Sequence, residues 1–177
     1  GPRIRVRLFA GPGLDTLSLS DSGTIAQAYQ MGVPMGGELT MTEGDEAPAF
    51  LAWATRDPLS APLQRLQIVK GWSDGSETHE TVYDVACAGG AEPDPASHRC
   101  PDNQATVDLS DCSISANSGS AELKTVWQDP DFDPGQRAFY YARTLENPTC
   151  RWSTWDALRA GVMPRPDFPA TIQERAW

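Results

Sequence analysis

Few residues in this chain are of a type that could carry out catalysis. The two histidines, His79 and His98, have no partner at the spacing that metal ligands need. Glu77 and Glu80 flank His79 and suggest acid–base chemistry, but alternation along a strand places His79 and Glu80 on opposite faces. No serine or cysteine lies in a nucleophile motif, and no glycine loop leads into a helix. We therefore predict no catalytic residue, no metal ligand and no cofactor in this chain.

Three carboxylates alternate in residues 129–134, as they do in a calcium-binding loop. In an EF-hand that began at Asp129, Pro134 and Tyr140 would occupy the positions of the invariant glycine and the bidentate glutamate. This excludes an EF-hand. A looser calcium site remains an alternative, but a proline-stiffened turn between two strands is the simpler interpretation.

The chain has four cysteines, an even number, and none forms a C-x-x-C pair. Four cysteines allow three connectivities, and we favour Cys87 with Cys100 and Cys112 with Cys150 because the first loop is short and rich in turn residues. A zinc site is the alternative, since His98 lies two residues before Cys100, but the spacing matches no common zinc module. Disulfides predict an exported protein, periplasmic or extracellular.

The opening segment, residues 3–8, alternates strictly between charged and apolar side chains and predicts a strand. Arg3, Arg5 and Arg7 lie on one face of this strand. In a chain of net charge −10, such a row is expected to meet carboxylates of this domain or of a neighbouring domain. A plain solvated face is the alternative.

Two other segments could form contacts. The loop 32–37, which includes Met35, is rigid, and it lacks the following helix that a phosphate-binding loop needs. Near the C-terminus, Arg151, Trp152 and Trp155 form a combination often found at binding surfaces. The simpler interpretation of the tryptophans is that they belong to the core and pack at the start of a helix.

Hydrophobic periodicity and turn signals predict a mainly β protein, an antiparallel, immunoglobulin-like β-sandwich with one or two short helices. Asp74-Gly75 is a sequence typical of a hairpin turn and predicts that the strands 63–72 and 79–86 form a β-hairpin. We also expect the strands 121–127 and 137–145 to pair with each other. Ser153 and Asp156 form a capping box, which predicts that Ser153 caps the second helix. Besides the opening strand, the predicted strands are 50–55, 63–72, 79–86, 121–127 and 137–145. The first predicted helix covers 24–31 and ends at a glycine cap, Gly32, and the second starts at residue 153.

Length and charge limit the range of functions. The 177 residues fit a single domain, and a net charge of −10 with a pI of about 4.5 argues against a nucleic-acid partner. No apolar run reaches the length of a membrane span, and no signal segment opens the chain. The oligomeric state is not encoded in any pattern that we can interpret.

Five groups of residues together resemble the C-terminal part of a bacterial family known as domain of unknown function 3604. The resemblance covers nearly the whole chain. The segments are 1–7 (GPRIRVR), 32–37 (GVPMGG), 63–72 (LQRLQIVKGW) with 77–80 (ETHE), 129–134 (DPDFDP) with 137–141 (RAFYY), and 146–153 (ENPTCRWS).

The resemblance implies that residues 1–177 are one C-terminal β-domain of a larger exported protein that continues a few residues further. Members of the family have an N-terminal part similar to a PHP-type metallohydrolase barrel with divalent metals. The expected function is then that of an accessory domain of a metal-dependent hydrolase, with phosphoester bonds as the expected substrate class. The domain is expected to pack on its own N-terminal catalytic domain and to shape the approach to the active site. The alternative is a free-standing extracellular binding or adhesion module without enzymatic role.

Overall fold

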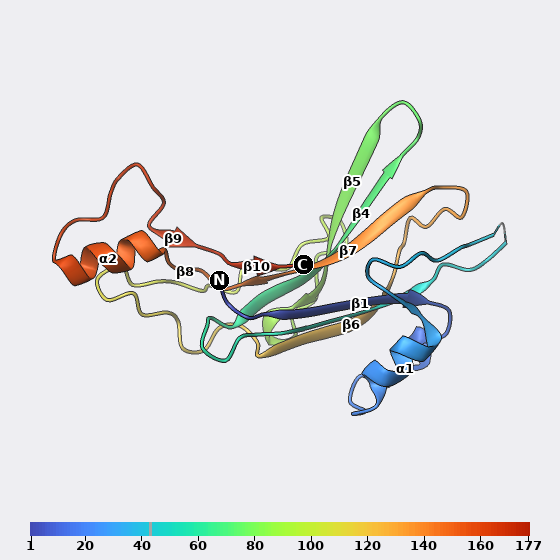
Figure 1. Cartoon of the computed structure of the whole chain (residues 1–177), viewed down its shortest axis with the longest axis horizontal. Helices are drawn as coiled ribbons and strands as arrows, with labels where there is room; N and C mark the ends of the chain where they lie inside the picture. Colours follow the sequence, from blue (N-terminus) through green and yellow to red (C-terminus); the bar gives the residue numbers. More distant parts are fainter. Residues whose placement is uncertain (43) are drawn as a thin grey trace.

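The computed structural model describes residues 1–42 and 44–177 as two four-stranded antiparallel sheets packed together (Figure 1). Sheet A has the strand order β2-β1-β3-β6, sheet B has the order β10-β7-β4-β5, and β8 pairs with β9. The predicted β-sandwich with two short helices is confirmed. The elements are β1 (Arg5–Gly11), η1 (Leu14–Thr16), α1 (Thr24–Met31), β2 (Val33–Pro34), β3 (Ala49–Thr55), β4 (Leu63–Ser73), β5 (Thr78–Cys87), η2 (Ala88–Gly90), β6 (Glu122–Gln128), β7 (Ala138–Glu146), β8 (Thr149–Cys150), α2 (Trp152–Ala160), β9 (Thr171–Ile172) and β10 (Arg175–Ala176).

The main core lies between the two sheets and follows the two-residue period of the strands. Leu8 of β1, Phe50 of β3 and Leu123 of β6 meet Leu66 and Ile68 of β4, and all five side chains are buried. Burying an aliphatic or aromatic side chain of this size stabilises a fold by roughly 1.5–3 kcal/mol. The alternating apolar positions therefore explain why the sheets pack face to face.

A second apolar cluster covers part of the outer face of sheet A. Phe9 of β1 and Leu51 of β3 point away from the main core and pack with Leu14 and with Ala28 of α1. Because this part of β3 is buried on both faces, its sequence is almost continuously apolar. The cluster reaches only one end of sheet A, and α1 leaves the other end of the outer face uncovered.

The predicted β4–β5 hairpin is confirmed, with Trp72 opposite His79. The Asp74 carboxylate accepts hydrogen bonds from the backbone N–H groups of Ser76 and Glu77, at 2.9 Å each. Gly75 has a φ of 93°, a conformation that glycine adopts without strain. Figure 1 shows that the tip of this hairpin extends beyond the body of the sandwich.

The expected pairing of the fourth and fifth predicted strands is wrong. β6 pairs with β3 in sheet A, whereas β7 pairs with β4 in sheet B. The segment 129–137 between them crosses from one sheet to the other, which a tight hairpin turn cannot do. The apolar faces of β6 and β7 then lie in opposite layers of the sandwich.

The caps of both helices differ from the prediction. α2 begins at Trp152, so Ser153 lies inside the helix, and no side chain caps its first turn. Its C-terminal end is closed by Gly161, which adopts the left-handed conformation at φ 65°. Gly32 does follow α1 but is extended, and a Cβ there would lie 2.9 Å from the Ala10 carbonyl oxygen, so close packing is what requires glycine.

Candidate functional site

Both expected disulfides are present. Cys87 at the end of β5 bonds to Cys100, and Cys112 bonds to Cys150, with Cα–Cα distances of 5.6 Å in both pairs. The zinc alternative fails because Cys100 is bonded to Cys87, and the ring of His98 packs against an aromatic ring of β5 instead. Disulfides of this kind are typical of an oxidising, extracytoplasmic environment.

The alternating carboxylates of the segment 129–134 do not converge on a common point. The Asp129 carboxylate accepts a hydrogen bond from Lys70, inside the sandwich. The Asp131 carboxylate accepts one from the Tyr83 hydroxyl at 3.0 Å, and the Asp133 carboxylate accepts one from the backbone N–H of Gly135 at 2.8 Å. Within residues 1–42 and 44–177, no group of three or more histidine, cysteine, aspartate or glutamate side chains could hold a metal ion. The segment is a crossover between the sheets, tied down by its own carboxylates.

A buried ion pair anchors this crossover. The Lys70 ammonium of β4 lies 2.5 Å from the Asp129 carboxylate, and the two side chains are 2% and 0% exposed. Lys70 also donates to the Asp131 carbonyl at 2.7 Å, and the Tyr140 hydroxyl donates to Asp129 at 2.7 Å. Lys70 is not among the predicted site residues. Its position two residues after Ile68 already places it on the core-facing side of β4, which is the signal that could have identified it.

Two tyrosines complete this group. Burial, the hydrogen bond to Asp129 and the charge of Asp129 raise the pKa of the Tyr140 hydroxyl well above its usual value. Burial and the bond to Asp131 act in the same direction on the pKa of Tyr83. Both hydroxyls therefore keep their protons at neutral pH and act as hydrogen-bond donors to the carboxylates.

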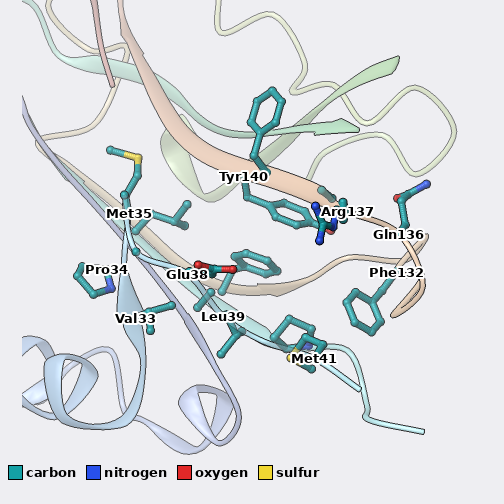
Figure 2. Close-up of a pocket in the computed structure, with 18 of the residues that line it drawn as sticks. Val33, Pro34, Met35, Glu38, Leu39, Met41, Phe132, Gln136, Arg137 and Tyr140 are labelled. Atoms are coloured by element: carbon teal, nitrogen blue, oxygen red, sulfur yellow. The ribbon is translucent and has the colours of Figure 1, made fainter. Parts of the chain in front are cut away.

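A cleft of about 580 Å³ opens between the two sheets beside this group. Its floor comes from the inner faces of β1, β3 and β7, and includes the ring of Tyr140. The walls are the loop after β2 on one side and the crossover 129–137 on the other (Figure 2). Met35 and Phe132 stand on opposite sides of the cleft, and Glu38 and Arg137 add charge to its lining. Met35, predicted as a contact residue, therefore lies at this cleft.

The predicted arginine row lies along β1. Arg5 and Arg7 point to the outer face of sheet A, beyond the part that α1 covers, and Arg3 precedes the strand. None of the ion pairs between residues that the structure describes includes any of the three guanidinium groups. The charge of Arg3 nevertheless helps to lower the pKa of the Asp57 carboxyl, after the backbone N–H groups of Arg3 and Leu59. The expectation that the row meets carboxylates of this domain or of a neighbouring domain stays a prediction.

The side chains beside this row on β3 and β6 include a lysine, a tryptophan and a glutamate. Trp53 lies opposite Arg7, and Lys124 lies opposite Trp53 on the far side. The Lys124 ammonium is 4.4 Å from the centre of the Trp53 ring, and both side chains bond to Glu122. We call the outer-face residues of this uncovered region the basic face of sheet A: Arg5, Arg7, Trp53, Glu122 and Lys124.

The predicted contact residues of α2 are exposed. Trp152 is 74% and Trp155 is 39% exposed, so the simpler interpretation, that they belong to the core, is wrong. α2 projects from one end of the sandwich, away from the two four-stranded sheets (Figure 1). Arg151 is held in place, since its Nε donates to the Pro169 carbonyl at 3.1 Å, and Arg159 lies over the Trp155 ring at 5.6 Å.

The structure thus separates the predicted contact residues into two regions. Met35 lies at the end of the sandwich where β2 pairs with the end of β1. Trp152 and Trp155 lie at the opposite end, on α2 (Figure 1). The start of the arginine row is on the α2 side, because Arg5 opens β1 and its partner Thr55 closes β3. Met35 and the tryptophans do not form one site.

His79 takes part in the hairpin and not in a reactive group. Its ring stacks on Trp72 with a centroid distance of 5.2 Å, and its Nε2 lies 2.9 Å from the Asp74 carboxylate. The backbone N–H of Glu77, followed by His79 and Ser76, lowers the pKa of Asp74 well below its usual range. These contacts stabilise the turn, as expected for the shoulder of a hairpin.

The architecture defines a disulfide-linked antiparallel β-sandwich domain. The chain belongs to a family described as protein of unknown function (DUF3604), which matches it over residues 1–177. No curated protein and no solved structure matches the chain. In the part that the structure describes, no helix has both the length and the apolar character needed to cross a membrane.

Proposed function

We propose that this β-sandwich is the accessory C-terminal domain of a metal-dependent hydrolase, one that acts on phosphoester bonds, and that the basic face of sheet A packs on the catalytic domain. Divalent metal would be held by that catalytic domain. The single observation that carries the docking role is the row of Arg5 and Arg7 on the outer face of sheet A, at the end that α1 does not cover. Neither has an ion-pair partner among the described residues, and Arg7 lies beside the half-buried Trp53 at the border of the second apolar cluster.

Charge supports a specific kind of partner. The chain has 14 basic and 24 acidic residues, so a surface on which Arg5, Arg7 and Lys124 stand together differs from the rest of the molecule. An acidic surface of the neighbouring domain complements this face, and such charge complementarity fixes the orientation of docking more than its strength.

The chain path supports the same arrangement. The backbone N–H of Arg3 donates to the Asp57 carboxylate at 2.7 Å, and Gly1 lies near the Glu174 carboxylate. These contacts hold the start of the chain on the body of the sandwich, directly before the arginine row. A domain joined ahead of Gly1 would therefore be placed next to Arg3 and Arg5, and on the α2 side of the molecule.

The test is charge reversal in the longer protein that contains this domain. We expect Arg3→Glu/Arg5→Glu/Arg7→Glu to leave the β-sandwich folded, to lower the melting temperature of the longer protein, and to expose the junction before Gly1 to limited proteolysis. Arg137→Glu reverses the charge of an exposed arginine at the opposite end of the sandwich and is the control. It should leave the melting temperature and the cleavage rate at the junction unchanged. An unchanged melting temperature and an unchanged cleavage rate in the triple variant would refute the docking role.

A second function, a free-standing binding module, is favoured by the cleft beside Met35. The cleft lies far from the α2 end and is large enough for a small ligand. A ligand bound there would raise the melting temperature of the isolated domain, and Arg137→Glu would alter that rise while the arginine-row triple variant would not. The two functions thus predict opposite roles for these two sets of residues.

A further inference from the structure

The buried pair of Lys70 and Asp129 has the geometry of a reactive pair. We propose that Lys70 and Asp129 condense into an isopeptide bond that covalently joins β4 of sheet B to the end of β6 in sheet A. The Lys70 Nζ lies 2.5 Å from Asp129 Oδ2, and neither side chain is in contact with bulk water. The two residues are 59 positions apart in the chain, so the bond would close the sandwich at the end where the cleft opens.

Burial of the two charges favours their condensation. Two opposite charges removed from water lose hydration energy that their mutual attraction offsets only in part. Condensation replaces the two buried charges with one neutral amide, which removes the cost of burying them.

The neighbouring groups are placed to assist the reaction. The Asp131 backbone N–H donates to Asp129 Oδ1 at 2.9 Å and would stabilise negative charge on that oxygen in the tetrahedral intermediate. The Tyr140 hydroxyl donates to Oδ2 at 2.7 Å and can protonate it. The Asp131 carbonyl accepts from Lys70 Nζ at 2.7 Å and fixes the direction of the amine. Positioning of this kind can supply a large effective concentration of the nucleophile.

The step balances without any further reactant. One ammonium proton of Lys70 passes to Asp129 Oδ2, which leaves a neutral amine and a carboxylic acid. The amine nitrogen attacks Cγ, the Nζ–Cγ bond forms, and a second proton passes to Oδ2 through the Tyr140 hydroxyl, which gives up its own proton and takes one back. The Cγ–Oδ2 bond then breaks, its electron pair leaves with the oxygen, and one water is released. No oxidant is needed and the net charge does not change.

The released water can leave through the cleft between the sheets. The ring of Tyr140 lines the cleft between the sheets, and the same residue contacts the leaving oxygen. The rings of Trp72 and Tyr140 lie 5.3 and 5.9 Å from Lys70 Nζ and shield the amide from attack by bulk water once it has formed. The bond is then expected to persist in the folded protein.

The mass of the full chain tests the proposal. After reduction and alkylation of the disulfides, we expect the denatured protein to be one water lighter than the mass calculated for its fully alkylated sequence. We also expect a proteolytic digest to contain one branched peptide that carries both Lys70 and Asp129. Lys70→Met should restore the mass calculated from its sequence. Lys124→Met, which removes a lysine whose ion pair with Glu122 is only partly buried, should not. Asp129→Asn should lose one ammonia instead of one water, because the amide nitrogen is then the leaving group.

A wild-type chain at its full sequence mass, with Lys70 and Asp129 in separate unmodified peptides, overturns the proposal and leaves an ordinary buried ion pair. This measurement is independent of whether Lys70→Met folds. Tyr140→Phe separates the role of the hydroxyl: slower appearance of the lighter species in freshly made protein is expected, and an unchanged rate would remove Tyr140 from the mechanism. Neither result depends on the docking role proposed above.

Discussion

The far end of the Phe139 ring covers Gly71, its cross-strand neighbour in sheet B. A Cβ at Gly71 would lie 2.3 Å from the Phe139 Cζ, so the ring occupies the space that any side chain there would fill. We expect Gly71→Ala to displace the ring into solvent and to lower the free energy of unfolding by about 1 kcal/mol, the scale of a cross-strand aromatic contact.

A double-mutant cycle checks this relationship by chemical denaturation. Because Phe139→Ala removes the same contact, Gly71→Ala should have little additional effect in the Phe139→Ala background. Additive effects of the two changes would show that the ring and the glycine are not coupled.

Gly119 should be the least replaceable glycine. Its φ is 96°, and a Cβ there would lie 2.5 Å from Pro62 Cβ and 2.7 Å from Asn147 Nδ2. We expect Gly119→Ala to lower the free energy of unfolding by about 3 kcal/mol, from backbone strain and overpacking together. Gly75 is the matched control, since its φ is 93° and nothing lies within 4 Å, so Gly75→Ala should cost only about 1 kcal/mol from strain. Equal losses in urea denaturation would contradict the packing argument.

The two disulfides should differ in their contribution to stability. The Cys87–Cys100 bond closes a loop with a sequence separation of 13, and the Cys112–Cys150 bond one of 38. Since the entropy removed from the unfolded chain rises with loop length, we expect losses of about 3 and about 4 kcal/mol for the paired Cys→Ser variants. Urea denaturation of the two double variants measures the difference, and a larger loss for Cys87→Ser/Cys100→Ser would reverse the expected order.

Glu146 should make stability depend on pH. Its side chain is fully buried, Ser60 donates to Oε2 at 2.7 Å, and no described residue bonds to Oε1. Burial raises the pKa of Glu146 above its ordinary value of 4.5, with help from the charges of Glu174 and Asp57, while Ser60 and Arg56 act against the shift.

A raised pKa means that the folded state binds the proton more tightly than the unfolded state. The stabilisation is complete below the unfolded-state pKa and is lost as the pH rises through the folded-state pKa. Glu146→Gln cannot titrate, so its free energy of unfolding relative to wild type should increase as the pH rises above about 4.5. Parallel pH profiles of the two proteins would contradict the assignment.

Much of the fold could be predicted from local pattern. The α1 range, the β4–β5 hairpin with Asp74-Gly75 in its turn, and the core-facing positions Leu66 and Ile68 all appear in the structure as expected. These features depend on residues close together in the chain, and the two-residue period of a strand already determines which side chains share a face.

The candidate site depended on contacts between distant segments. The alternation along β4 placed Lys70 on the core face, but no local pattern could show that Asp129, from the other sheet, would meet it there. For the same reason the pairing of β6 with β7 was predicted wrongly, since strand order depends on which apolar faces find each other across the whole sandwich.

The sequence by itself determined the strand-rich character and the positions of the turns, because both rest on local conformational preference or on residue type. It left three disulfide connectivities open, and the tertiary structure decided for the favoured one by bringing Cys112 and Cys150 together. The tertiary structure alone decided which residues are exposed or brought together: Trp152 and Trp155 are uncovered on α2, and Met35 lies at the opposite end from them. Burial is a property of the packed molecule, because the surface that covers a side chain comes from segments far from it in the chain.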